Sequence, residues 1–202
     1  MNQSRKSDSS LFTEFRDRSI MLLMLVFMFS AALSAHQSTH WVEQVSPNGK
    51  CIAIEDQSVW LIAPNTRHIS QKWQKNDELV IYPNVDLFSN ETFPFYICNN
   101  TRSGSVVSAV LQLGPEKACD HTTWIDEVDV SKGHVILVDR DEAMSHWDVD
   151  EQDRDRFLNW ESDHGIIIGN NDGLLSWWYS NCKHVLINVN CREWIRVTKR
   201  VQ

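Results

Sequence analysis

The chain has 202 residues, of which 42% are hydrophobic and 23% charged, and its formal net charge is −8. This excess of acid argues against nucleic acid as a partner, because phosphates call for a basic protein face. It also argues against adhesion to an anionic membrane surface. The length allows one domain or two small domains.

The first 35 residues have the pattern of a secretory signal peptide. Basic side chains precede a 14-residue apolar run from Ile20 to Leu33, and small residues follow up to Ala35. A membrane-spanning helix needs roughly 20 apolar residues, so the run is too short to span comfortably. We expect residues 1–35 to be removed and the rest to be periplasmic or secreted, without stable membrane insertion. An uncleaved anchor is the alternative.

Residues 36–202 carry 15 basic and 24 acidic side chains, a net charge of −9, which favours solubility. All five cysteines lie in this part. In an oxidising compartment some should pair, but an odd number leaves at least one unpaired. Because CxxC does not occur, the spacing signals for thioredoxin chemistry and for a zinc ribbon are missing. The cysteines are Cys51, Cys98, Cys119, Cys182 and Cys191.

An internal repeat organises the chain. Two segments start with a tryptophan: "WQKNDELVIYPNVD" from Trp73 and "WESDHGIIIGNNDG" from Trp160. In each segment an acidic residue follows the tryptophan after three or four residues, and then come an aliphatic run and an asparagine. Similar segments precede and follow both, in the same order and at offsets of 83 to 90 residues. This indicates a tandem duplication, with a first repeat at 36–113, a linker at 114–122 and a second repeat at 123–202. The paired positions are Trp41 and Trp124, Trp60 and Trp147, Trp73 and Trp160, Asp77 and Asp163, and Asn84 and Asn171.

Both repeats are predicted to be β structure, because short runs rich in Val, Ile and aromatic residues alternate with turn residues. Six short strands per repeat fit a small barrel or a compact roll. The fold class is therefore all-β, with two tandem barrel-like or roll-like units that we expect to pack together. One short helix is expected at 150–160 and an added hairpin at 174–180. Strands are expected at 41–45, 50–54, 59–62, 78–82, 94–98, 105–113, 124–128, 134–138, 143–149, 165–169, 184–189 and 193–198.

The repeated motif has a structural explanation. Its tryptophan covers the open end of the unit, and its acid accepts hydrogen bonds from turn amides before the strand begins. The aliphatic run is expected to be buried on both faces, and the asparagine to end it in a turn.

The first repeat also resembles a known group. "IAIEDQSVWLIAP" followed by "WQKNDELVIYPN" is similar to uncharacterised small exported β-domain proteins of Gram-negative intracellular bacteria. These carry acidic-x-Ser-x-Trp and then Trp-x-x-x-Asp-x-Ile-x-Ile-x-x-Asn. The resemblance covers residues 41–113 best, and "VDRDEAMSHW" departs from it in the second repeat. It implies β structure and export and carries over no catalytic residue.

The enzymatic alternative is a hydrolase whose acids and histidines converge from the second repeat, at Asp148, Asp150, His146 and His164. Active residues acquired after duplication would be present in one repeat and missing from the other. Cys119 and His121, two residues apart, offer a Cys–His pair by sequence alone, but the fold rather than nearness in sequence makes such pairs. A linker cysteine available for a disulfide is the plainer interpretation.

A calcium-stabilised adhesion-like module is a further alternative, because the stretch "DVDEQDRDRF" supplies oxygen ligands. An EF-hand loop beginning at Asp148 requires glycine sixth and glutamate twelfth, and Asp153 and Asn159 stand there. A solvated helix face with Arg154 and Arg156 as partners is favoured instead. We therefore expect no metal and no cofactor.

The candidate binding residues are Trp177, Trp178 and Tyr179, which the first repeat lacks. Neighbours in a strand point to opposite faces, so one tryptophan should face outwards unless both are buried in packed layers. An exposed aromatic pair can stack on a glycan or anchor a protein partner. The leading hypothesis is an exported, non-enzymatic binding or interaction module of the cell envelope.

Overall fold

The structure is a computed structural model that describes residues 39–85, 92–171 and 180–201. Residues 38–202 form one compact unit. Among the described residues, no helix combines the length and hydrophobicity needed to cross a membrane. The predicted leader (1–35), most of the added hairpin (174–180) and the aromatic residues Trp177, Trp178 and Tyr179 lie outside the described residues.

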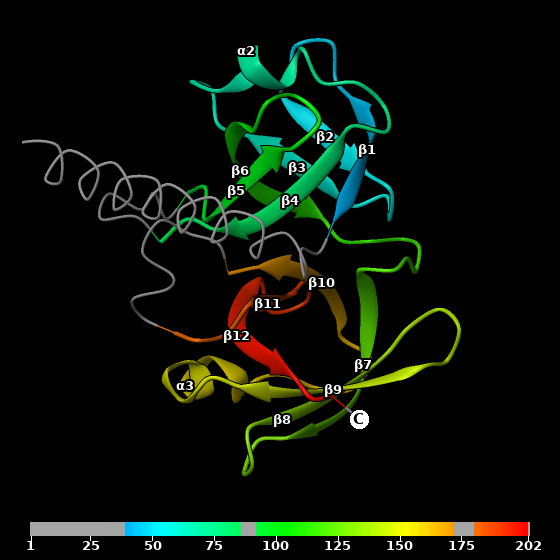
Figure 1. Cartoon of the computed structure of the whole chain (residues 1–202), viewed down its shortest axis with the longest axis vertical. Coiled ribbons are helices and arrows are strands. Elements are labelled where there is room, and N and C mark those ends of the chain that lie inside the picture. Colours follow the sequence, from blue (N-terminus) through cyan, green and yellow to red (C-terminus); the bar gives the residue numbers. More distant parts are fainter. Residues whose placement is uncertain (1–38, 86–91, 172–179, 202) are drawn as a thin grey trace, which may run out of the picture. The chain divides into compact units, whose positions relative to one another are not determined.

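The first repeat is a closed barrel of six antiparallel strands in the order β1-β2-β3-β6-β5-β4 (Figure 1). A single helical turn, α2 (Arg67–Ser70), connects β3 to β4. The strands are β1 (His40–Val45), β2 (Cys51–Ile54), β3 (Val59–Ile62), β4 (Glu78–Pro83), β5 (Phe95–Asn99) and β6 (Ser105–Leu113).

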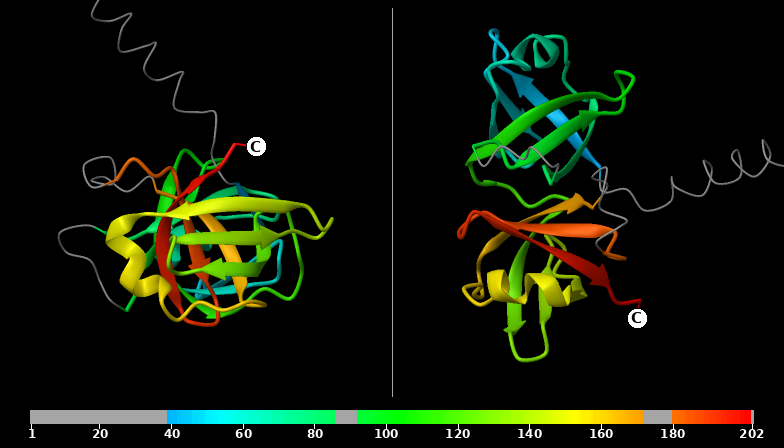
Figure 2. Two further views of the ribbon diagram at one scale, coloured as in Figure 1. Left: turned by 90° about the horizontal axis from the view of Figure 1, so that it is seen from below. Right: turned by 90° about the vertical axis from the view of Figure 1, so that its left-hand side faces the viewer.

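The second repeat is a closed barrel with the equivalent order, β7-β8-β9-β12-β11-β10. Figure 2 shows it from two further sides, with the red β12 paired to the yellow β9. A 3₁₀ turn, η1 (Glu151–Asp153), and α3 (Arg154–Phe157) form the predicted short helix. The strands are β7 (Thr122–Asp129), β8 (His134–Val138), β9 (Met144–Val149), β10 (Gly165–Asn170), β11 (His184–Asn188) and β12 (Glu193–Lys199).

The predicted all-β fold and internal repeat are therefore confirmed. The strands Val59–Ile62, Ser105–Leu113 and His134–Val138 have the predicted bounds, and the others differ by one or two residues at either end. The boundaries were predictable because turn residues mark them. Gly49, at φ +65°, is one: a Cβ there would lie 2.2 Å from the Arg67 carbonyl oxygen.

One tryptophan fills the interior of each barrel. Trp60 and Trp147 are 0% and 2% exposed. Each indole Nε1 donates a hydrogen bond to the serine two residues earlier, Ser58 at 3.0 Å and Ser145 at 2.9 Å. Alternate residues of a strand share a face, so Ser-x-Trp brings both side chains inside and satisfies the buried N–H group.

We expect Ser58→Ala and Ser145→Ala each to lower the free energy of unfolding by about 1–2 kcal/mol, because each leaves a buried indole N–H without a partner. Urea denaturation followed by tryptophan fluorescence measures both. Equal losses would support equivalent roles in the two barrels; no loss in either variant would contradict the role of this hydrogen bond.

The asparagine of the repeated motif ties its strand to the next one. The Asn84 backbone N donates to the Pro94 carbonyl at 2.8 Å, and the Asn171 backbone N donates to Lys183 at 3.0 Å. The Asn171 side chain also donates to the Cys182 carbonyl at 2.8 Å. These bonds continue the pairing between the two strands, and the predicted turns themselves (86–91 and 172–179) lie outside the described residues.

The two barrels pack against each other through β4 and β10. In β10, Ile166 and Ile168 lie in the core of the second barrel, whereas Ile167 joins the core cluster of the first. Val185 and Ile187 of β11 join that same cluster. The aliphatic run "GIIIG" is therefore buried on both faces, as predicted, because each face meets a different core.

Polar contacts reinforce this packing, and we refer to them together as the barrel joint. The Thr122 hydroxyl donates to the buried Asp56 carboxylate at 2.6 Å. His40, which is 0% exposed, lies 2.6 Å from Glu55 through Nδ1 and 3.0 Å from the Ile168 carbonyl through Nε2. Since a carbonyl oxygen only accepts hydrogen bonds, the Nε2 atom of His40 carries a proton. The Nδ1 atom of the same ring faces the Glu55 carboxylate.

The surroundings of His40 in the barrel joint favour its charged form. Burial alone would lower the pKa of His40, but the hydrogen bond and charge of Glu55, together with Asp56 and the Ile168 carbonyl, raise it above 6.5. Burial would raise the pKa of Glu55, yet His40 and the Trp41 amide lower it below 4.5. Both shifts favour an imidazolium paired with a carboxylate, and the same imidazole reaches the second barrel at the Ile168 carbonyl.

All five cysteines are free thiols, which corrects the prediction that some pair. Cys51 lies on β2 and Cys98 on β5, strands that are not neighbours in the barrel. Cys182 and Cys191 flank β11 at opposite ends. A disulfide needs Cα atoms within about 7 Å, and the fold separates these positions.

Candidate functional site

The outward side of β8, β9 and β12 in the second barrel differs in chemistry from the matching side of the first barrel. In β9, Trp147 and Val149 point into the core, so alternate residues between and beside them point outwards. The register pairs Asp148 with His134 of β8 and with Thr198 of β12. We call this set the outer polar face: His134, His146, Asp148, Asp150, Thr198 and Arg200.

The equivalent positions of the first barrel are neutral. The register around Trp60 and Trp147 matches four of them, because the same strands pair in both barrels. The counterparts are Cys51 for His134, Val59 for His146, Leu61 for Asp148 and Val110 for Thr198. At these four positions histidine, aspartate and threonine therefore stand only in the second copy.

A row of hydrogen bonds crosses the outer polar face. His134 Nε2 lies 3.2 Å from His146 Nδ1, and His134 Nδ1 lies 3.3 Å from Asp148 Oδ1. Arg200 donates to both oxygens of Asp148, at 2.8 and 2.6 Å. First the hydrogen bond from Arg200, and then the one with His134, outweigh burial and lower the pKa of Asp148. The row runs histidine, histidine, carboxylate, guanidinium.

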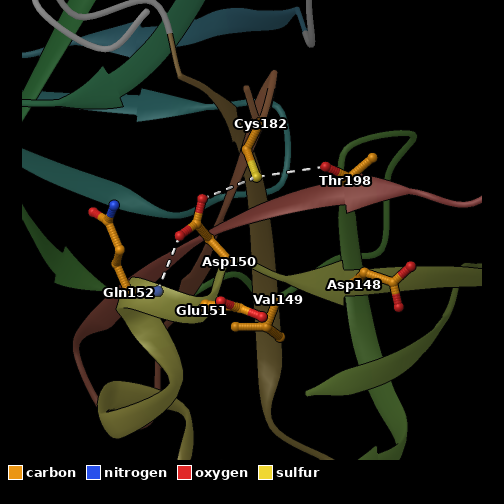
Figure 3. Close-up of a pocket in the computed structure, with 7 residues that line it drawn as sticks. All are labelled: Asp148, Val149, Asp150, Glu151, Gln152, Cys182 and Thr198. Carbon is orange, nitrogen blue, oxygen red and sulfur yellow. Dashed lines mark hydrogen bonds between the residues drawn. The ribbon is translucent and has the colours of Figure 1, made fainter. Parts of the chain in front are cut away.

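An open hollow of about 370 Å³ lies beside this row (Figure 3). Figure 3 shows the Asp150 carboxylate between the Gln152 backbone nitrogen and the Cys182 thiol, with distances of 3.0 and 3.5 Å. Ser180 donates to Asp150 at 2.5 Å. Burial opposes ionisation of Asp150, but these bonds outweigh it and lower its pKa. The lining residues are Asp148, Val149, Asp150, Glu151, Gln152, Cys182 and Thr198.

The acidic stretch is held by arginines from β12 and its end. Asp153 accepts from Arg196 at 2.7 and 2.8 Å, and Asp148 pairs with Arg200. These partners differ from the predicted Arg154 and Arg156; Arg156 instead lies over the Trp194 ring. Within 39–85, 92–171 and 180–201, no group of three or more His, Cys, Asp and Glu side chains is placed to hold a metal ion.

His164 lies away from the other three predicted catalytic residues. It contacts Asn188 and Cys191, near the start of β12, whereas Asp148 pairs near the other end of that strand. Five residues of strand separate the two ends by roughly 16 Å. The structure therefore brings His146, Asp148 and Asp150 together on one face and excludes His164 from them.

His164 replaces the motif acid of the first repeat. Asp77 accepts from Gln74 N at 2.9 Å and from Asn99 at 2.9 Å and also pairs with Arg102. His164 Nδ1 occupies the same place, 3.4 Å from Glu161 N and 3.1 Å from Asn188. The predicted equivalent, Asp163, instead matches Asn76, and both have φ +67°. The motif acid predicted for the second repeat is thus displaced by one residue.

The cysteines nearest to histidines are not activated nucleophiles. Burial, followed by Glu193 and Glu161, raises the pKa of Cys191, which lies 3.7 Å from His164. Burial raises the pKa of Cys119 to about 12, and its thiol donates to Glu55 at 3.3 Å. A catalytic thiol needs a lowered pKa, so neither contact supports the Cys–His interpretation.

Sequence reasoning missed His134, Thr198, Arg200 and Cys182 as members of this region. A comparison of outward positions between the aligned repeats would have found His134 and Thr198, since Cys51 and Val110 stand in their places. Arg200 and Cys182 come from beyond β12 and from before β11, and no spacing signal links them to β9.

Comparisons of this chain with protein-family models, with curated proteins and with solved structures found no match. The resemblance to small exported β-domain proteins therefore stays a prediction, and function is argued from the site alone.

Proposed function

We propose that this chain is an exported, non-enzymatic binding module of the cell envelope. Its second barrel binds a protein partner at the hollow on the outer polar face, where the carboxylates receive a lysine or arginine of that partner. The observation that carries the proposal is the difference between the copies, because one packed scaffold acquired ionisable groups on a single outward face. The fold does not require these ionisable groups, since the first barrel forms with Cys51, Val59, Leu61 and Val110 at the matching positions.

The charge of the hollow supports a cationic ligand group. Asp148, Asp150 and Glu151 line it, and Arg200 offsets one of these charges at Asp148. The carboxylates stay ionised because hydrogen bonds lower the pKa of Asp148 and Asp150. A cleft lined by one sign of charge attracts groups of the opposite sign.

The chemistry of the face supports binding rather than hydrolysis. Cys182 Sγ lies 3.5 Å from Asp150 and 3.4 Å from Thr198 Oγ1, so its contacts are a carboxylate and a hydroxyl. Ser180 bonds to the same carboxylate. A nucleophile needs a base that takes its proton, and ionised Asp150, with its lowered pKa, is a weak base.

The test uses a fluorescein-labelled ten-residue peptide of alternating lysine and glycine, with binding followed by anisotropy. We expect Asp150→Asn/Glu151→Lys to weaken binding at least tenfold, a change of about 1.4 kcal/mol. Asp126→Asn/Glu127→Lys is the matched control: it changes the net charge equally, at exposed positions of β7, and should bind within twofold of the parent.

Equal weakening in both variants would show that the peptide responds to overall charge, and the proposal would fail. A glutamate–glycine peptide of the same length should not bind to the parent. Binding should also weaken as salt is raised, because the contacts are ionic and exposed.

A further inference from the structure

We propose that His134 and His146 form a site for a divalent transition-metal ion of the zinc and nickel class. The two histidines project from neighbouring strands, β8 and β9, on the outer polar face. The inference goes beyond the proposed function, because the ligand and its two ligating side chains differ from those of the hollow.

The separation of the two ring nitrogens fits shared coordination. His134 Nε2 and His146 Nδ1 are 3.2 Å apart. Metal–nitrogen bonds of about 2.0–2.1 Å at a tetrahedral angle place two ligand nitrogens about 3.3 Å apart. Without metal, one ring N–H donates to the other ring nitrogen, and the ring planes lie 22° apart with centroids 5.4 Å apart. With metal, the ion replaces that proton, and both rings turn about their side-chain bonds so that their lone pairs meet at the ion.

Asp148 and Arg200 prepare His134 for this role. When Asp148 accepts from His134 Nδ1, the lone pair of the imidazole is on Nε2, the atom that faces His146. Arg200 fixes Asp148 through two hydrogen bonds, so the carboxylate orients the ring rather than binding the ion. A carboxylate behind a histidine ligand is the usual support of metal-bound imidazole.

The site has two protein ligands, and water completes the coordination. This agrees with the finding that no three candidate side chains converge among the described residues. The His134 side chain is 13% exposed, which leaves its edge accessible to an ion from solvent. The first barrel has Cys51 and Val59 at the two positions, so the site is specific to the second.

Nickel is the suitable probe, because imidazole suits it and thiolates select it less than they select zinc. Calorimetric titration of the untagged protein with NiCl₂ at pH 7.5 should give one site. His146→Asn and His134→Asn should each weaken binding at least tenfold. Asp148→Asn should weaken it 10–100-fold, the usual loss when a supporting carboxylate is removed. His68→Asn, at an exposed position of α2, is the control and should bind as the parent does.

Anomalous diffraction from nickel-soaked crystals should place the ion about 2.1 Å from both ring nitrogens. Unchanged nickel binding in His146→Asn, or an ion located elsewhere, would overturn the proposal. His146→Asn keeps it falsifiable if His134→Asn does not fold. The lysine–glycine peptide distinguishes the two proposals: His146→Asn should retain peptide binding, and Asp150→Asn/Glu151→Lys should retain nickel binding.

Discussion

Replacement of Asp153 by alanine is expected to lower the free energy of unfolding by about 3–5 kcal/mol. Asp153 is 2% exposed and accepts from the Arg196 backbone N at 2.8 Å and from its guanidinium at 2.7 and 2.8 Å. Removal of the carboxylate leaves an arginine that is mostly buried without its counter-charge, which costs more than the pair itself contributes.

Guanidinium chloride denaturation measures this loss. Asp153→Asn separates the effect of the lost charge from the effect of the lost side-chain volume. The amide keeps the volume of the carboxylate and only part of its hydrogen bonding. Asp141→Ala is the control: its pair with Arg140 spans 3.5 Å and both side chains are more than half exposed, so the change should be under about 1 kcal/mol. Comparable effects of Asp153→Ala and Asp141→Ala would contradict the role assigned to burial.

Replacement of Glu55 by alanine is expected to cost about 3 kcal/mol, because it leaves the buried charge of His40 unpaired in the barrel joint. The Thr122–Asp56 bond remains, so the fold should persist with weaker attachment between the barrels. Glu43→Ala, which removes an exposed partner of Lys75, should change stability by under about 1 kcal/mol.

The same pair makes stability depend on pH in a defined direction. The pKa of His40 is raised, so the stability that His40 contributes is fully present below pH 6.5. It is lost as pH rises through the folded-state pKa. The pKa of Glu55 is lowered, so its contribution is complete above 4.5 and is lost as pH falls through the folded-state value. The contribution of the pair is therefore largest between about pH 4.5 and 6.5.

Denaturation of the parent and of Glu55→Gln across pH 4 to 9 checks this window. The difference in free energy of unfolding between the two proteins should be greatest near pH 5.5 and should decrease above the folded-state pKa of His40. A difference that is constant with pH would contradict a charged His40. His121, whose ring lies 5.6 Å from that of His40, has a pKa lowered by burial and then by the charge of His40.

The repeat and most of the fold could be predicted because they depend on local patterns. Trp60 and Trp147 recur with their serines, and the aliphatic runs recur before Asn84 and Asn171. Strand ends follow turn residues such as Gly49. The expected burial of "GIIIG" on both faces required only its uninterrupted apolar character.

The candidate site was less predictable because it depends on strand register. His134 and His146 are 12 residues apart, and only the β8–β9 pairing places them on one face. His164 was assigned to the candidate site because acidic residues and histidines lie near it in the sequence. In the folded barrel its side chain contacts Asn188 instead. Arg200 reaches Asp148 across 52 residues, a contact that no local pattern encodes.

The ring order of the second barrel keeps its two surfaces apart. β10 and β11 form the arc that grips the first barrel, and β8 and β9 occupy the arc across the ring. β7 and β12 lie between these two arcs, so a contact made on one arc reaches the other through these strands and through the core around Trp147. Mutations on β8 and β9 can therefore accumulate without weakening the contact between the barrels. After duplication, one side of the second barrel holds the two units together and the other side is free to change.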